Sequence, residues 1–176
     1  MNYYEFLRLE RKLALDSKEL EKRFYSLSRE YHPDMHSRKG PAERLQAEEN
    51  SALLNDAYRA LRDPITRAEY LLKLEGFDIG EQGSKDVPPE LLEEVFELNM
   101  ALEELSSGDE DAIPQLEAAR QRFLGMRGEL DREMQQKFEE WDRTGSRDVL
   151  AAIRSMLNRR KYITNLIDKT NVPDRV

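Results

Sequence analysis

The chain has 176 residues and a net charge of −8, with charged side chains at 36% and hydrophobic side chains at 39%. It contains no cysteine and only two histidines, which excludes disulfides, thiolate metal sites, cysteine nucleophiles and histidine-rich metal sites. The acidic balance disfavours nucleic-acid binding, because phosphate contacts require a basic surface. No apolar run approaches the roughly 20 residues of a membrane-spanning helix, and the N-terminus lacks a signal-peptide pattern. We therefore expect a cytoplasmic protein that binds neither nucleic acid nor membranes.

Two helices are predicted at the start of the chain. Residues 2–9 are apolar enough for a short helix. Asp16 and Glu19 form a capping box that begins a second, longer helix. Pro33 ends that helix, because the residue before a proline is pushed away from helical geometry. The second helix is therefore expected over residues 16–31.

A polar loop separates the second helix from two further helices. The third is predicted over residues 42–61. Its inward face is predicted to hold Leu45, Leu54, Ala57, Tyr58 and Leu61. Asp63 and Pro64 restart the chain into a short fourth helix. The second and third helices should therefore form a hairpin that packs through its apolar sides.

A stretch rich in glycine and proline at residues 76–88 is predicted to be a linker between two domains, 1–75 and 89–176. Three amphipathic stretches follow it, with apolar residues at steps of three and four. Short polar breaks at residues 106–108 and 144–146 separate them. Such helices, joined by short turns, predict an antiparallel three-helix bundle. The fold class is therefore all-α, with a helical hairpin and short flanking helices before the bundle.

The tetrapeptide Tyr31-His32-Pro33-Asp34 stands at the predicted tip of the hairpin. One side of the second helix leads to it, as a stripe about 60° wide on the helical wheel. The stripe holds Lys18, Lys22, Tyr25 and Arg29. A lysine-rich outer face is ordinary by itself. A basic stripe that ends at a His-Pro-Asp loop is more than a solvated face requires.

The residues alone leave several interpretations of the His-Pro-Asp segment open. A metal site through His32, Asp34 and His36 offers too few ligands. A catalytic His–Asp pair lacks a nucleophile and a nearby cleft. An ordinary turn is possible, because Asp and Pro are frequent in turns. A recognition loop fits best, because Pro33 fixes the backbone while the imidazole and the carboxylate offer directional hydrogen bonds.

Two longer runs carry more information than the tetrapeptide: LEKRFYSLSREYHPD and NDAYRALRDPITRAEYLL. Together they resemble a J-domain, the four-helix module of DnaJ-type co-chaperones. In that family the His-Pro-Asp loop and the basic face of the second helix engage a DnaK-class chaperone and stimulate its ATPase. The resemblance implies that the chaperone-binding residues are Lys18, Lys22, Tyr25, Arg29, His32, Pro33 and Asp34. The chain departs from the family pattern at Met35, where a lysine or arginine is common.

The rest of the chain resembles one branch of that family. A Gly/Phe-rich linker and a zinc module with Cys pairs are both absent, and RAEYLLKLEGFD followed by three helices is similar to HscB-type J-proteins of iron–sulfur cluster biogenesis. This resemblance implies an HscA-like chaperone and an IscU-like scaffold protein as partners, with no cofactor and no metal. It implies an adaptor that delivers the scaffold and activates the ATPase, rather than an enzyme, and the chain has no Gly-rich phosphate loop.

Three alternatives compete with this interpretation. The first is a J-protein adaptor for a different client. The second is a helical regulatory or nucleic-acid-binding module that uses the basic stripe, which the global acidity opposes. The third is a hydrolase that uses His32 and Asp34.

The first helix of the predicted bundle carries two apolar rows. The row expected to face the bundle core is Leu91, Val95, Leu98, Leu102 and Leu105. A single core face cannot also bury the second row, which is Leu92, Phe96 and Met100, flanked by Glu93, Glu97 and Glu104. An apolar strip with an acidic rim is typical of a protein-binding surface. Alternatively, the second row packs on the N-terminal domain or on the third bundle helix.

The family resemblance implies scaffold contacts on this same helix. The motif places them at Leu92, Phe96, Glu97 and Glu104, and we add Met100 because it belongs to the same row. Two positions depart from the family pattern. Glu93 stands where a methionine is expected, and Met100 where a glutamate is expected.

Overall fold

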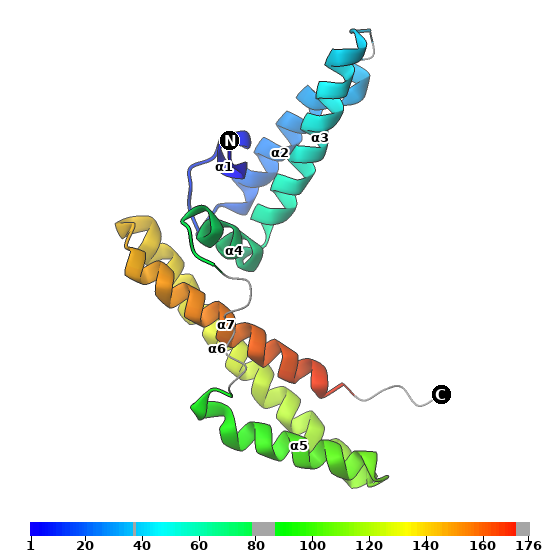
Figure 1. The fold of residues 1–176 in the computed structure, drawn as a ribbon, viewed down its shortest axis with the longest axis vertical. Helices are drawn as coiled ribbons and strands as arrows, with labels where there is room; N and C mark the ends of the chain where they lie inside the picture. The colour runs from blue at the N-terminus through cyan, green and yellow to red at the C-terminus, as the bar shows by residue number, and fades with distance from the viewer. Residues whose placement is uncertain (37, 79–86, 172–176) are drawn as a thin grey trace. The chain divides into compact units, whose positions relative to one another are not determined.

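The computed structural model describes residues 1–36, 38–78 and 87–171 (Figure 1). Within these ranges every regular element is a helix, which confirms the all-α fold class. Residues 79–86 of the predicted linker lie outside the described part of the chain. None of the described helices is long and apolar enough to cross a membrane.

The chain divides into two compact units. The first consists of Met1–Phe77 together with Phe138–Gly145, and the second of Asp78–Lys137 together with Ser146–Val176.

The first unit is built on a helical hairpin, as predicted. Its helices are α1 (Tyr3–Phe6), α2 (Ser17–Tyr31), α3 (Pro41–Arg62) and α4 (Pro64–Leu74), and a 3₁₀ turn, η1 (Pro33–His36), follows α2. In Figure 1, α2 and α3 run side by side, with η1 at the far end of the pair. The hairpin therefore ends at the His-Pro-Asp segment.

Side-chain caps begin three of these helices. Asn2 accepts a hydrogen bond from Glu5 N at the start of α1, and the Glu5 side chain completes a capping box there. Asp63 accepts hydrogen bonds from Ile65 N and Thr66 N at the start of α4. Asp16 accepts a hydrogen bond from Lys18 N at the start of α2. The predicted capping box at Asp16 and Glu19 is wrong, because Asp16 caps Lys18 N rather than Glu19 N, and the Glu19 carboxylate lies 3.6 Å from the guanidinium of Arg23 one turn later.

Two further sequence predictions in this unit are wrong. The first helix ends at Phe6 instead of residue 9, and the chain turns through Arg8, which has a φ of 58°. Leu45, predicted to face inward, is 56% exposed, while Ala47 is buried. Leu45 and Leu54 are nine residues apart, and this is two and a half helical turns, so they lie on opposite sides of α3.

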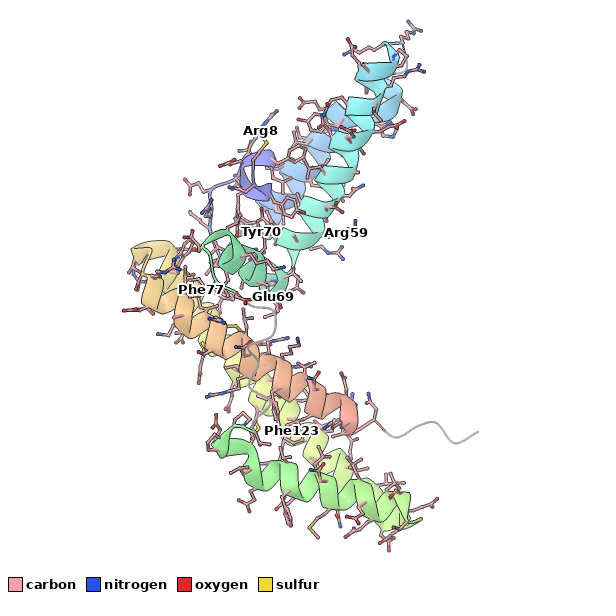
Figure 2. All side chains as sticks on the ribbon, in the orientation of Figure 1. Arg8, Arg59, Glu69, Tyr70, Phe77 and Phe123 are labelled. Atoms are coloured by element: carbon pink, nitrogen blue, oxygen red, sulfur yellow. The ribbon has the colours of Figure 1, made fainter. Side chains whose placement is uncertain are left out.

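The core of the first unit lies between α2, α3 and α4. Aromatic rings join its elements: Phe24 of α2 stacks on Tyr58 of α3 with centroids 4.2 Å apart, and Tyr3 stacks on Tyr70 at 4.6 Å. Tyr70, which is labelled in Figure 2, accepts a hydrogen bond from Tyr3 N at its hydroxyl. Burial raises the pKa of Tyr70.

A loop between α1 and α2 is held by charged groups from distant parts of the same unit. The buried Arg67 donates from Nη1 to Leu13 O and from Nε to Leu61 O, both at 2.8 Å. Burial lowers the pKa of Arg67, since desolvation disfavours its charge. Asp142 accepts from Leu13 N at 2.7 Å and from Ala14 N at 2.9 Å. The peptide groups around Leu13 are therefore fixed from both sides.

The second unit contains the three long helices of the predicted bundle. They are α5 (Leu92–Ser106), α6 (Ile113–Thr144) and α7 (Arg147–Lys169), with short 3₁₀ turns η2 (Pro89–Leu91) and η3 (Glu110–Ala112) before α5 and α6. The last turns of α6, from Phe138 onward, belong to the first unit. Figure 1 shows α7 returning along α6. Arg160 of α7 pairs with Asp131 of α6 at 2.7 Å.

The core of the second unit confirms the predicted inward row of α5. Leu91 and Leu98 are buried in it, and the other three members of the row are partly buried against it. The buried partners from α6 include Phe123, which is labelled in Figure 2 and has 0% exposure. From α7, Ile163 and Leu166 contribute.

Candidate protein-binding surfaces

The hairpin tip, residues 32–35, presents an imidazole and a carboxylate to solvent. The backbone of His32 is extended, and this ends α2. The turn that follows is closed by a hydrogen bond of 3.0 Å that Met35 N donates to His32 O. Asp34 N donates to Nδ1 of His32 at 3.2 Å. The His32 side chain is 57% exposed and that of Asp34 is 91% exposed. The two groups that sequence reasoning singled out therefore lie together at the end of the hairpin.

The hydrogen bond at His32 defines what the imidazole offers. Because Nδ1 accepts from Asp34 N, a neutral ring carries its proton on Nε2. Nδ1 also lies 3.6 Å from Asp34 Oδ2, which becomes an ion pair only when the ring is protonated. The tip can thus present a donor at Nε2 and an acceptor at the Asp34 carboxylate. Pro33 begins the 3₁₀ turn between them.

The α2 stripe, defined as Lys18, Lys22, Tyr25 and Arg29, is exposed along its whole length. Tyr25 is 61% exposed, whereas Leu20 and Leu27 on the other side of α2 are buried. The three cations make no ion pair with any described residue. The surface around them is a shallow, open hollow lined by side chains near or on α2 alone, and such a surface fits a protein partner better than a small molecule.

The α5 row, defined as Leu92, Phe96 and Met100, is exposed as a continuous apolar strip. The three side chains are 57%, 65% and 47% exposed. The alternative in which this row packs on the third bundle helix is wrong, because the opposite face of α5 fills the core. Exposed aromatic, leucine and methionine side chains in one patch are typical of a protein-binding surface.

The acidic rim of the α5 row is partly paired. Glu97 lies 3.5 Å from the guanidinium of Arg122 on α6, and both side chains remain about half exposed. Glu93 is exposed and Glu104 is half-buried. Glu103 lies about 20° from Leu92 on the helical wheel and is also exposed. Sequence reasoning missed Glu103, although the same wheel would have placed it on this face.

Comparison with known proteins identifies the family to which the two parts of the chain are similar. Residues 2–70 match the model of the DnaJ domain, and residues 87–171 match the model of the HSCB C-terminal oligomerisation domain. Chaperone HscB from Vibrio cholerae is similar over 97% of this chain and 95% of its own, with 28% identity and a TM-score of 0.67. The human co-chaperone protein HscB is similar over 97% of this chain and 80% of its own, with 27% identity and a TM-score of 0.71.

This chain belongs to the HscB-type J-domain co-chaperones. The family resemblance drawn from the sequence is thereby confirmed. The DnaJ-domain match includes the hairpin tip and the α2 stripe, and the HSCB C-terminal match includes the α5 row. The hairpin tip and the α2 stripe of this HscB-type protein thus lie on one family module, and the α5 row lies on the other.

Within the described part of the HscB-type chain, no group of three or more His, Asp or Glu side chains could hold a metal ion. The hairpin tip offers His32 and Asp34 without a third such neighbour in that part. What the described surfaces offer is an exposed cationic stripe, a hydrogen-bonding tip and an apolar strip. Surfaces of these three kinds are typical of proteins that bind other proteins.

Proposed function

We propose that this HscB-type protein is an adaptor between two other proteins. Its hairpin tip and α2 stripe dock on a DnaK-class, HscA-like chaperone and stimulate ATP hydrolysis there. Its α5 surface, meaning the α5 row together with its acidic rim, carries an IscU-like iron–sulfur scaffold protein, which is delivered to that chaperone. The protein itself is not an enzyme, and it works in the cytoplasm. In this proposal the J-domain, residues 1–75, binds the chaperone, and the C-terminal domain, residues 89–176, binds the scaffold. Residues 76–88 are the linker between them.

The observation that carries this proposal is an exposed hairpin tip at the end of an exposed stripe of cations on α2. Lys18, Lys22 and Arg29 attract an acidic surface, and this electrostatic complementarity raises the rate of encounter and orients the partner. The tip then supplies directional hydrogen bonds from His32 and Asp34. Docking accelerates hydrolysis only if it favours the hydrolysis-competent state of the chaperone over its resting state.

The α5 surface supplies the second half of the adaptor. We assign scaffold contacts to Leu92, Phe96, Glu97, Met100 and Glu104. The apolar row provides area to bury, and the carboxylates of the rim provide charge for orientation. A scaffold held on this surface has a raised local concentration at the chaperone, because the two binding events become linked in one chain.

A three-component binding experiment tests the adaptor proposal. Purified HscA-like chaperone and IscU-like scaffold are mixed with the chain in the presence of ATP and analysed by size-exclusion chromatography with light scattering. The proposal expects the chain to co-elute with each partner separately. An Arg29→Glu, Lys22→Glu variant is expected to keep the scaffold and lose the chaperone, and a Phe96→Ala variant to do the reverse.

Two outcomes would contradict the adaptor proposal. The first is that both variants retain both partners. The second is that an unfolded model protein competes with the scaffold for the α5 surface at equal concentration, which would favour the different-client alternative.

A further inference from the structure

The methionines of this chain differ sharply in exposure. Met35 and Met100 are 68% and 47% exposed, and they are the exposed internal methionines. The remaining internal methionines are sheltered in the second unit: Met126, Met134 and Met156. Because the chain has no cysteine, these two exposed thioethers have no thiol to compete with them for an oxidant.

The two exposed methionines also lie on the two proposed recognition surfaces. Met35 follows Asp34 in the hairpin tip, where its backbone N–H closes the turn onto His32 O. Met100 is the C-terminal member of the α5 row. One exposed thioether thus stands at each surface of the adaptor.

We propose that Met35 and Met100 are modification sites, at which reversible oxidation by a hydroperoxide releases the adaptor from its partners. The proposal rests on the function proposed above. A sulfur lone pair attacks one oxygen of the peroxide, and the O–O bond breaks as the S=O bond forms. The proton on the attacked oxygen passes to the departing oxygen, which leaves as water or an alcohol. Sulfur is oxidised by two electrons and the peroxide is reduced by two.

The physical effect follows from the polarity of the product. A sulfoxide is a polar hydrogen-bond acceptor where a thioether is apolar. On the α5 row, docking would bury that acceptor against an apolar partner surface without a donor, and this disfavours binding. At the hairpin tip, oxidation adds a polar acceptor to the exposed residue that follows Asp34, where it competes for the donors of the partner. Neither change disturbs the cores of the two units, because both side chains point to solvent.

The first test measures selectivity and is independent of any partner. The full chain is treated with limiting hydrogen peroxide, digested, and analysed by mass spectrometry at each methionine. We expect sulfoxide at Met35 and Met100 well before it forms at Met126, Met134 or Met156. Equal rates at all five positions would overturn the proposal.

The second test measures function on the oxidised, intact chain. We expect oxidation to weaken scaffold binding by about tenfold, the typical effect of burying one unpaired polar group. It should also lower chaperone stimulation, and methionine sulfoxide reductases should restore both. Met100→Leu should abolish the peroxide effect on scaffold binding only, and Met35→Leu the effect on stimulation only. Each variant is compared with its own untreated sample, so any effect of the substitution itself cancels.

The outcomes separate this proposal from the function on which it rests. If the untreated chain binds neither partner, the proposed function fails. If the untreated chain binds both partners and the oxidised chain binds them equally well, the redox proposal alone is overturned. Equal peroxide sensitivity in both leucine variants and the unmodified chain would overturn it as well.

Discussion

Truncation of the exposed apolar side chains of α5 gives the sharpest quantitative prediction. Phe96 is 65% exposed. Since an aromatic side chain buries 150–250 Å² in total, a docked partner can cover roughly 100–150 Å² more of Phe96, worth about 3 kcal/mol at about 25 cal/mol per Å². Phe96→Ala keeps part of that area, so we expect a loss of about 2 kcal/mol, or about 30-fold in Kd. The smaller Leu92, 57% exposed, should lose about 1 kcal/mol.

The assay is isothermal titration calorimetry of each variant against the purified scaffold. Leu45→Ala is a matched control, because Leu45 is 56% exposed but lies on α3 in the first unit. We expect Leu45→Ala to leave scaffold affinity unchanged. None of the three variants should change the unfolding temperature by more than a degree or two, because the side chains contribute little to either core.

Two results would refute this reasoning about α5. One is an unchanged Kd in Phe96→Ala and Leu92→Ala, which would place the scaffold elsewhere. The other is an equal loss of affinity in Leu45→Ala, which would show that the assay responds to any lost surface leucine.

Three further predictions concern stability. Arg67→Met leaves two main-chain carbonyls without their charged donor and should lower the free energy of unfolding by about 2–4 kcal/mol in urea titrations; a loss below 1 kcal/mol would contradict that role. Burial raises the pKa of Tyr4 far above its usual range, so the folded state holds the phenol proton where the unfolded state releases it. Stability should therefore fall as pH rises above about 10, the unfolded value, and Tyr4→Phe should flatten this alkaline decline; an unchanged slope would argue against it. Gly125→Ala adds a Cβ that meets nothing within 4 Å in the middle of α6, so thermal unfolding should show a gain of about 0.5–1 kcal/mol rather than a loss.

Helical periodicity predicted much of the fold and the two faces of α5. Leu98 is buried and Phe96 is exposed because a 3.6-residue repeat separates their faces, and this requires no tertiary information. The same repeat places Leu45 and Leu54 on opposite sides of α3. The wrong prediction for Leu45 was therefore avoidable, because the sequence itself places Leu45 on the side of α3 opposite to Leu54.

The loop between α1 and α2 could not be predicted in this way. Asp142 and Leu13 are 129 residues apart in the sequence, and their hydrogen bond forms only when the first unit folds and brings both segments together. Likewise, the sequence gives no sign that Arg67 is buried, because an arginine within an amphipathic helix is usually exposed. Such contacts depend on tertiary packing, which local propensity does not encode.

The geometry of the hairpin tip lies between these cases. The residue types and the proline predicted an exposed turn, but not the hydrogen bond from Asp34 N to the imidazole that assigns its tautomer. That bond depends on the path of η1. The partners proposed above rest on the family resemblance, since no spacing of residues specifies which chaperone or scaffold is recognised.

The most direct test of the account is single-turnover ATP hydrolysis by the purified HscA-like chaperone with saturating adaptor. Asp34→Asn removes the charge of a carboxylate that is 91% exposed, so folding should be unaffected. Asp56→Asn is the matched control, an exposed aspartate on α3 outside the α2 stripe and the hairpin tip. The account predicts that Asp56→Asn stimulates hydrolysis like the unmodified chain and that Asp34→Asn does not. Full stimulation by Asp34→Asn would contradict the central claim.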